Sequence, residues 1–161
     1  ITNSFAWSPD ATRIAFVASP DGESPRDVFV APATGGTLAT QVGAAGMPAH
    51  DVLDFAWSPD SAQVAFRAVL NGNSWSALFT SGPGFSSVPY AVSGNGAFVY
   101  EVFEYDWSTE GQRLAFRASL HNEDTGLLVV DRFAAAEPVA LDTTITTLPE
   151  SRVASPHLGR R

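Results

Sequence analysis

Three histidines and two acidic loops contain the side chains of this sequence that could bind a metal ion. His50, His121 and His157 have no second histidine or carboxylate at the spacing of a zinc motif such as HExxH. Residues 20–23 (PDGE) and 121–124 (HNED) offer oxygen ligands of the kind that calcium prefers, but neither fits the twelve-residue EF-hand loop. We therefore expect no cofactor and no metal site, with calcium at these loops as the alternative.

The sequence also lacks the patterns that mark common catalytic sites. It contains no cysteine, no G-x-S-x-G nucleophile elbow and no glycine-rich phosphate loop that joins a strand to a helix. Glycoside hydrolysis needs two facing carboxylates at a set separation, and no motif selects such a pair from the 17 acidic residues. We expect that this chain is not an enzyme and holds no catalytic residue.

Composition narrows the class of protein further. The 161 residues are 45% hydrophobic and carry a net charge of −8, with nine arginines and no lysine. This content is too apolar for a disordered acidic tail, and no apolar run approaches the roughly 18 residues of a membrane span. A nucleic-acid binder needs a basic face, which this chain can hardly build. We expect a globular protein with no nucleic-acid partner and no transmembrane segment, whose acidic surface favours a protein partner or a cation.

A repeat of 50 residues organises the whole chain. Each copy has a tryptophan followed by serine, and then, at a fixed distance, an aliphatic residue, alanine and phenylalanine. Because the aromatic residues keep one register, we interpret them as a repeated core layer, with stacking on a sugar or peptide ligand as the alternative. They are Trp7, Trp57, Trp107, Phe16, Phe66 and Phe116.

Each copy of the repeat is predicted to form four short antiparallel strands. In the second copy the first two strands are predicted over 52–57 and 62–69, because these segments are rich in β-branched and aromatic residues. The third strands are predicted over 27–31, 75–80 and 126–131, and the fourth over 37–42, 87–93 and 138–145. Four strands in about 50 residues are typical of a β-propeller blade. The predicted blades span about 1–45, 50–95 and 100–147, and residues 148–161 begin a degenerate fourth repeat or a tail.

The repeated text resembles the WSPDG repeat of TolB-like β-propellers. Trp-Ser-Pro-Asp followed by aliphatic-Ala-Phe stands in the first two copies, with Ala11 and Ser61 in place of the usual glycine, and the third copy has Thr109-Glu110 in place of Pro-Asp. The resemblance implies an all-β propeller fold and an extracytoplasmic location, periplasmic or secreted. The same repeat also occurs in the propeller domains of prolyl oligopeptidase-type peptidases, so the motif specifies the blade and not the function.

A charged pair recurs at one strand position. If Trp57 lies opposite Val64 across the Ser-Pro-Asp turn, Asp54 falls opposite Arg67, and the same register puts Glu104 opposite Arg117. The first copy has uncharged Ser4 and Val17 at these positions. We expect two cross-strand ion pairs, partly buried because both faces of a blade pack on neighbouring blades. The alternative is that both arginines line a central channel and bind an anion.

The loops opposite the Ser-Pro-Asp turns form the predicted ligand or partner face. Loops on a rigid scaffold carry most binding functions, and this face gathers acids, amides, histidines and one tryptophan that stands outside the repeat register. The candidate residues are Asp21, Glu23, Arg26, His50, Asp51, Asn73, Trp75, His121, Glu123 and Asp124.

The leading interpretation is a non-catalytic scaffold or protein-interaction module. The alternatives are a propeller segment of a larger prolyl oligopeptidase-like hydrolase and a carbohydrate-binding surface propeller, for which Trp75 would be the recognition residue. Three blades are fewer than the roughly 4–8 of a closed propeller. We therefore expect either three blades of a longer propeller or a homodimer that closes a six-bladed ring.

Overall fold

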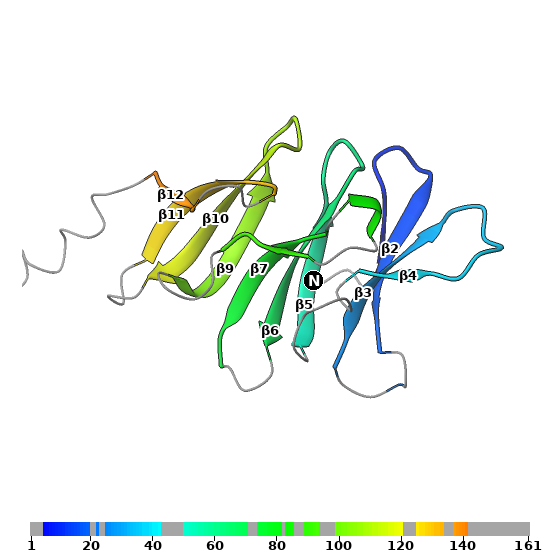
Figure 1. Ribbon diagram of the computed structural model, residues 1–161, viewed down its shortest axis with the longest axis horizontal. Helices are drawn as coiled ribbons and strands as arrows, with labels where there is room; N and C mark the ends of the chain where they lie inside the picture. Colours follow the sequence, from blue (N-terminus) through cyan, green and yellow to red (C-terminus); the bar gives the residue numbers. More distant parts are fainter. Residues whose placement is uncertain are drawn as a thin grey trace, which may run out of the picture.

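Three separate antiparallel sheets make up the described part of the molecule. The structure is a computed structural model of the chain and describes residues 5–19, 22, 25–42, 50–70, 74–81, 83–85, 89–93, 99–120, 125–133 and 137–141. Each sheet contains four strands that are consecutive in the sequence and paired in that order. The three sheets follow one another along the long axis of the molecule (Figure 1). We call them the first, second and third blade.

The strands lie close to the predicted positions. The first blade consists of β1 (Phe5–Trp7), β2 (Arg13–Ala18), β3 (Asp27–Pro32) and β4 (Thr40–Gln41). The second consists of β5 (His50–Trp57), β6 (Val64–Leu70), β7 (Ser76–Thr80) and β8 (Tyr90–Ala91), with a short 3₁₀ turn, η1 (Pro83–Phe85), before β8. The third consists of β9 (Val99–Trp107), β10 (Arg113–Leu120), β11 (Thr125–Asp131) and β12 (Val139–Ala140). The all-β blade architecture predicted from the repeat is confirmed.

Within the described residues, the fourth strand of each blade is shorter than the sequence predicts. β4, β8 and β12 each pair with the third strand through only two residues. Each of them lies at the edge of its sheet and therefore has one strand partner. A short edge strand presents few unpaired backbone groups to other chains, which protects the sheet against edge-to-edge association.

The predicted register of the first hairpin is confirmed. Trp57 lies opposite Val64, and Asp54 lies opposite Arg67. The third blade repeats the pairing, with Glu104 opposite Arg117. Both hairpins then shift register just beyond the acidic residue, which marks a β-bulge in β5 and β9.

The Ser-Pro-Asp segment makes a tight turn with its own internal hydrogen bonds. In the first blade the Ala11 amide donates to the Ser8 carbonyl at 2.8 Å, and Asp10 Oδ1 accepts the Ser8 hydroxyl at 2.6 Å and the Thr12 amide at 3.0 Å. These bonds lower the pKa of Asp10 to about 2, with the Ser8 hydroxyl as the largest cause and the Thr12 amide next. The second blade repeats the same bonds around Asp60. Such side-chain bonds to nearby backbone are what make aspartate a turn residue.

The residue after the acid adopts the left-handed conformation in all three turns. The φ angles are 57° for Ala11, 60° for Ser61 and 68° for Gly111. Only the third blade therefore has the glycine that this conformation favours, even though its turn lacks the Pro-Asp pair. The turn geometry survives in the other two blades at the cost of backbone strain.

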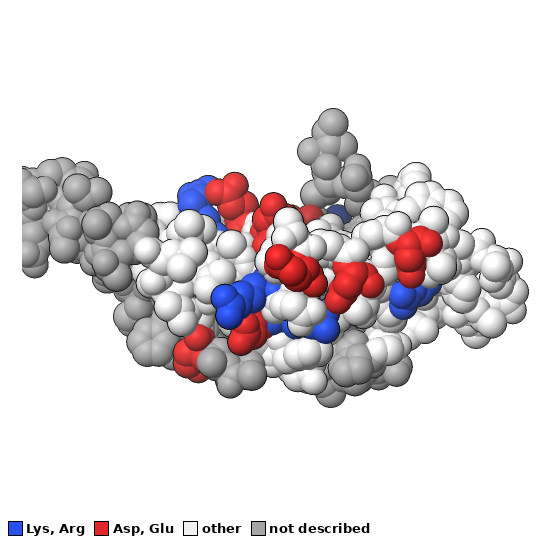
Figure 2. Space-filling model, turned by 90° about the horizontal axis from the view of Figure 1, so that it is seen from above, with Lys and Arg blue, Asp and Glu red and all other residues white. Residues whose placement is uncertain are grey.

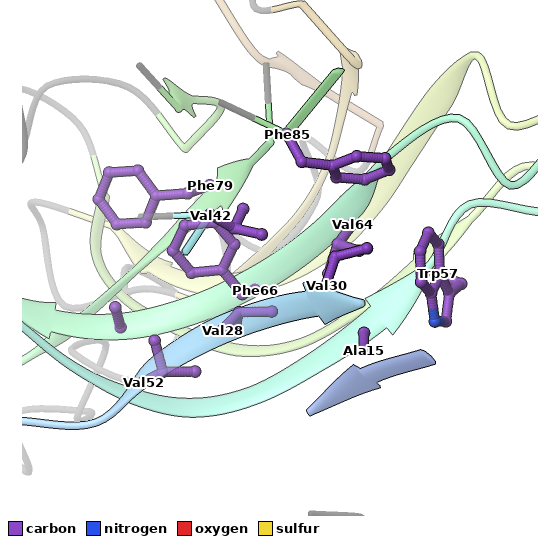
Figure 3. Packing of buried hydrophobic residues seen from close by; sticks show 11 residues of the cluster. Ala15, Val28, Val30, Val42, Val52, Trp57, Val64, Phe66, Phe79 and Phe85 are labelled. Carbon is purple, nitrogen blue, oxygen red and sulfur yellow. The ribbon is translucent and has the colours of Figure 1, made fainter. Parts of the chain in front are cut away.

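Hydrophobic cores lie between successive blades. In the first interface, Ala15, Val28 and Val30 of the first blade contact an aromatic layer of the second (Figure 3). That layer includes the stacked rings of Phe66 and Phe79, whose centroids are 5.5 Å apart. The second interface repeats the arrangement, with Ala65 and Leu78 on one side and the rings of Trp107 and Phe116 on the other. Each blade thus presents small and aliphatic side chains to the next blade and aromatic side chains to the previous one.

A tryptophan hydrogen bond accompanies each interface. Trp57 Nε1 donates to the Ala6 carbonyl of the first blade at 3.1 Å, and Trp107 Nε1 donates to the Ala56 carbonyl of the second at 3.3 Å. Both indoles are 9% exposed, whereas Trp7 is 54% exposed. The predicted core role therefore does not hold for Trp7 within this chain, because the described residues place no blade before the first one.

We predict that Ala11→Gly raises the melting temperature by roughly 2–4 °C. Relief of the left-handed alanine conformation stabilises the fold by about 1 kcal/mol, which corresponds to that shift for a chain of this size. Ser61→Gly serves as the matched variant, since it relieves the same strain but removes the hydroxyl that accepts the Asp10 amide at 3.0 Å. Differential scanning calorimetry should rank Ala11→Gly above Ser61→Gly, and a melting temperature below that of the wild type for Ala11→Gly would contradict the strain.

Candidate functional site

The strand ends divide between two edges of the molecule. The Ser-Pro-Asp and Ser-Thr-Glu turns that join the first two strands of each blade lie along one edge, at the top in Figure 1. We call this the turn edge. The opposite edge, where β2, β6 and β10 end and β3, β7 and β11 begin, is the loop edge. The predicted ligand face corresponds to this loop edge.

Four of the ten predicted face residues belong to the described part of the chain. Arg26 and Trp75 precede β3 and β7, and His50 and Asp51 begin β5. The others lie outside the described residues, and they are Asp21, Glu23, Asn73, His121, Glu123 and Asp124. For those six residues the ligand face stays a prediction.

Arg26 and Asp51 form a bidentate pair that joins the first two blades. Arg26 Nε donates to Asp51 Oδ1 and Arg26 Nη2 donates to Asp51 Oδ2, both at 3.0 Å. The backbone amide of Arg26 adds a third bond to Oδ1 at 3.0 Å, and the Arg26 carbonyl accepts the Val52 amide at 3.0 Å. The side-chain bond from Arg26 lowers the pKa of Asp51, and the same bond raises the pKa of Arg26. The pair is therefore charged at neutral pH and held in one orientation, although both side chains still reach solvent.

A buried polar cluster lies beside this pair. His50 Nε2 is 3.4 Å from Asp27 Oδ1, and their side chains are 8% and 4% exposed. Asp27 also accepts the Val28 amide and the Gln41 side-chain amide, each at 2.7 Å. Sequence reasoning selected His50 but missed Asp27 and Gln41, because nothing in the linear pattern separates a buried aspartate at a strand start from a solvated one. The cluster brings together three strands of two blades: a hydrogen bond joins Asp27 of β3 to Gln41 of β4, and His50 of β5 lies close to Asp27.

Trp75 is the exposed aromatic residue of the predicted face. Its side chain is 37% exposed, and it stands directly before β7 in the second blade. Arg26 and Asp51 have side-chain exposures of 47% and 37%. The loop edge thus presents an oriented ion pair and an aromatic ring to solvent.

The turn edge also connects neighbouring blades, and its polar groups are bonded to one another. Arg13 Nη2 of the first blade donates to the Ser61 carbonyl at 2.8 Å, and Arg132 Nη1 of the third donates to Asp60 Oδ2 at 2.6 Å. The Arg13 guanidinium also lies 5.0 Å from the centre of the Phe85 ring. Figure 2 looks onto this edge and shows acidic side chains that follow one another along it, with arginines beside them. Along the turn edge, the negative charges of the acidic side chains are therefore balanced by arginines of the same chain.

Arg67 bridges the second and third blades. Its Nε donates to Asp54 Oδ2 at 2.9 Å, Nη2 bonds the same oxygen, and Nη1 donates to the carbonyls of Val102 and Phe103 at 2.9 and 2.5 Å. The side-chain bond to Asp54 raises the pKa of Arg67. The acceptors Val102 and Phe103 lie at the β-bulge of β9. Arg67 therefore uses its N–H donors to join two blades. Few donors remain for the alternative role, which is to bind an anion in a central channel.

Arg117 makes the same pair in a different environment. Its Nε donates to Glu104 Oε1 at 2.7 Å, and its guanidinium lies 4.9 Å from the centre of the Phe103 ring. The two side chains are 46% and 67% exposed, against 20% and 22% for Arg67 and Asp54. The sequence predicts partial burial for both pairs, and this is wrong for the third blade, because no further described blade covers that face.

Metal binding and membrane insertion each require a recognisable arrangement of the described residues. These residues contain no group of three or more histidine, cysteine, aspartate or glutamate side chains arranged to hold a metal ion. The candidate calcium loops at 20–23 and 121–124 fall almost entirely outside this part of the chain. No described helix has the length and apolar character needed to cross a bilayer.

Comparison with solved structures defines the class of fold. The chain is similar to a protein described as TolB from Agrobacterium tumefaciens, with a TM-score of 0.57 and 16% identity over 84% of this chain and 47% of that one. It is also similar to TolB from Acinetobacter baumannii, with a TM-score of 0.56 and 13% identity over 86% of this chain and 31% of that one. Three consecutive four-stranded blades and these neighbours show a β-propeller fold. More particularly, it is a TolB-like propeller fold, and the chain spans less than half the length of either TolB structure.

The remaining comparisons add little to the fold. A protein described as a dipeptidyl aminopeptidase IV from Bacteroides ovatus matches with a TM-score of 0.49 and 17% identity, over 82% of this chain and 23% of that one, which is too slight a likeness to indicate function. No protein-family model matches the sequence, and no curated protein sequence aligns with it significantly.

We predict that Arg67→Ala lowers the free energy of unfolding by about 3 kcal/mol, because it leaves a partly buried Asp54 carboxylate and two inter-blade carbonyls without their donor. Arg117→Ala is the matched control and should cost less than about 1 kcal/mol, since its pair is exposed. Replacing both partners by Arg67→Met with Asp54→Leu should destabilise less than Arg67→Ala alone. Urea unfolding measures all three, and equal losses for Arg67→Ala and Arg117→Ala would contradict the assignment.

Proposed function

We propose that this chain is a non-catalytic interaction module that binds a protein partner through its loop edge. The observation that carries the proposal is the presentation of Arg26, Asp51 and Trp75 to solvent on strand ends of two tightly joined blades. Arginine and tryptophan are the residue types that most often dominate the binding energy of protein interfaces. A bidentate ion pair holds Arg26 in place before binding, which reduces the entropy lost on association.

The acidic character of the chain sets the kind of partner. With a net charge of −8, the chain attracts a basic surface at long range and repels another acidic one. We infer that the partner is a protein with a basic patch that includes a group able to accept hydrogen bonds from Arg26. The resemblance of the repeats to those of TolB-like propellers supports an extracytoplasmic setting for this encounter, periplasmic or secreted.

We predict that Trp75→Ser abolishes partner capture while the fold is kept. The wild-type chain, Trp75→Ser and Leu38→Ser would each be immobilised and exposed to an extracytoplasmic protein extract of the source organism, and the bound proteins identified by mass spectrometry. Leu38 is the matched control, because it is an apolar side chain that is 95% exposed and precedes β4 on the turn-edge side. Proteins retained by the wild type and Leu38→Ser but lost from Trp75→Ser are expected. Equal capture by the wild type and both variants would contradict the assignment of the partner site to the loop edge.

A further inference from the structure

The buried polar cluster of the first two blades departs from the repeat that organises the rest of the chain. Its members are Asp27 at the start of β3, Gln41 in β4 and His50 at the start of β5. The strand pairing gives each of them an equivalent residue where the second blade meets the third. These three residues are all apolar, and they are Ala77, Ala91 and Val99.

The contrast between the two junctions shows that the fold does not require polar side chains at these positions. Val99 is 7% exposed, so an aliphatic side chain fills the position of His50 in the third blade. Replacing a buried polar network by well-packed apolar groups is often neutral or stabilising. Packing alone therefore does not account for the cluster, and the first junction has a property that the second lacks.

The group of this cluster that titrates near neutral pH is His50. Its Nε2 lies 3.4 Å from Asp27 Oδ1, and the two side chains are 8% and 4% exposed. Asp27 also accepts the Val28 amide at Oδ1 and the Gln41 side-chain amide at Oδ2. A buried carboxylate without a countercharge is costly, and His50 is the basic side chain that lies against it in the described part of the chain. The carboxylate therefore favours the protonated imidazole, against the opposing effect of burial.

The other charged groups near His50 act in the same direction. Among the described residues they are Arg26 and Asp51, which are bonded to each other beside the cluster. The hydrogen bond from Arg26 is the largest cause of the lowered pKa of Asp51, and the positive charge of His50 is a smaller one. In β6 the residue opposite His50 is the apolar Leu70, and β4 contributes a neutral amide. Two carboxylates and one guanidinium leave a net negative charge around the imidazole.

We propose that His50 and Asp27 form a pH-sensitive ion pair that joins the first two blades. The protonated imidazole supplies the countercharge of Asp27 and holds the start of β5 against the start of β3. After loss of the proton, a buried carboxylate faces a neutral ring and the junction is weaker. Because the folded chain binds this proton more tightly than the unfolded chain, stability rises as pH falls through the histidine range.

An NMR titration of the histidine ring signals measures the pair directly. The signals of His50 are assigned by their loss in His50→Gln. In the wild type, the pKa measured for His50 should lie above the ordinary histidine value of about 6.5. Asp27→Asn removes the negative charge but keeps the size of the side chain, so it should lower that pKa. A wild-type pKa below the ordinary value, or one that Asp27→Asn leaves unchanged, would overturn the proposal.

A stability profile tests the contribution of the pair to the fold. The matched variant combines Asp27→Ala, Gln41→Ala and His50→Val, and so gives the first junction the apolar residues of the second. Its melting temperature and that of the wild type would be measured at roughly pH 8 and pH 5.5, on either side of the ordinary histidine pKa. The wild type should gain roughly 2–4 °C relative to the variant as pH falls.

His50→Gln provides a second variant, which should lose the same gain while it keeps a polar side chain at this position. Parallel changes in melting temperature for the wild type and both variants would overturn the proposal. These measurements use the chain without a partner, so the ion pair and the proposed partner site fail separately.

Discussion

The structure depends on the packing of an aromatic layer against a layer of small side chains between neighbouring blades. A single four-stranded sheet of this size cannot bury its apolar side chains by itself, so each blade needs a neighbour on both faces. The tryptophan indole adds direction to this packing, because its N–H donates to one alanine carbonyl of the previous blade. Trp57 and Trp107 thus both fill the core and set the position of one blade on the next.

The environment of each charged side chain depends on whether a neighbouring blade covers its face. Arg67 and Arg117 have the same strand position and the same kind of acidic partner, yet one bridges two blades and the other faces solvent. The covered arginine satisfies bulge carbonyls that would otherwise lack donors inside an interface, where an unbonded polar group is costly. The same residue type therefore joins two blades in one position and remains exposed to solvent in the other.

The two edges of the molecule differ in how their polar groups are used. At the turn edge, Arg13 and Arg132 bond the turns of the neighbouring blade, so charge is compensated within the chain. At the loop edge, the Arg26 and Asp51 pair joins two blades but keeps its outer side in solvent. A rigid base below exposed, oriented side chains is the arrangement in which propeller loops can bind a partner without reorganising the blades.

The repeat alone predicted the blades, the strand order and the register of the first hairpins. The spacing of tryptophan, turn and phenylalanine is fixed, so the first two strands can pair in only one register that puts the aromatic residues on the same face. It could not show which copies of a repeated residue are covered, since identical residues such as Trp7 and Trp57 differ only in whether a described blade precedes them. The cluster of Asp27, Gln41 and His50 also arises only when the second blade packs on the first, since His50 belongs to one blade and its neighbours to the other. Local pattern determines the blade, whereas burial and the inter-blade hydrogen bonds depend on how blades are placed against one another.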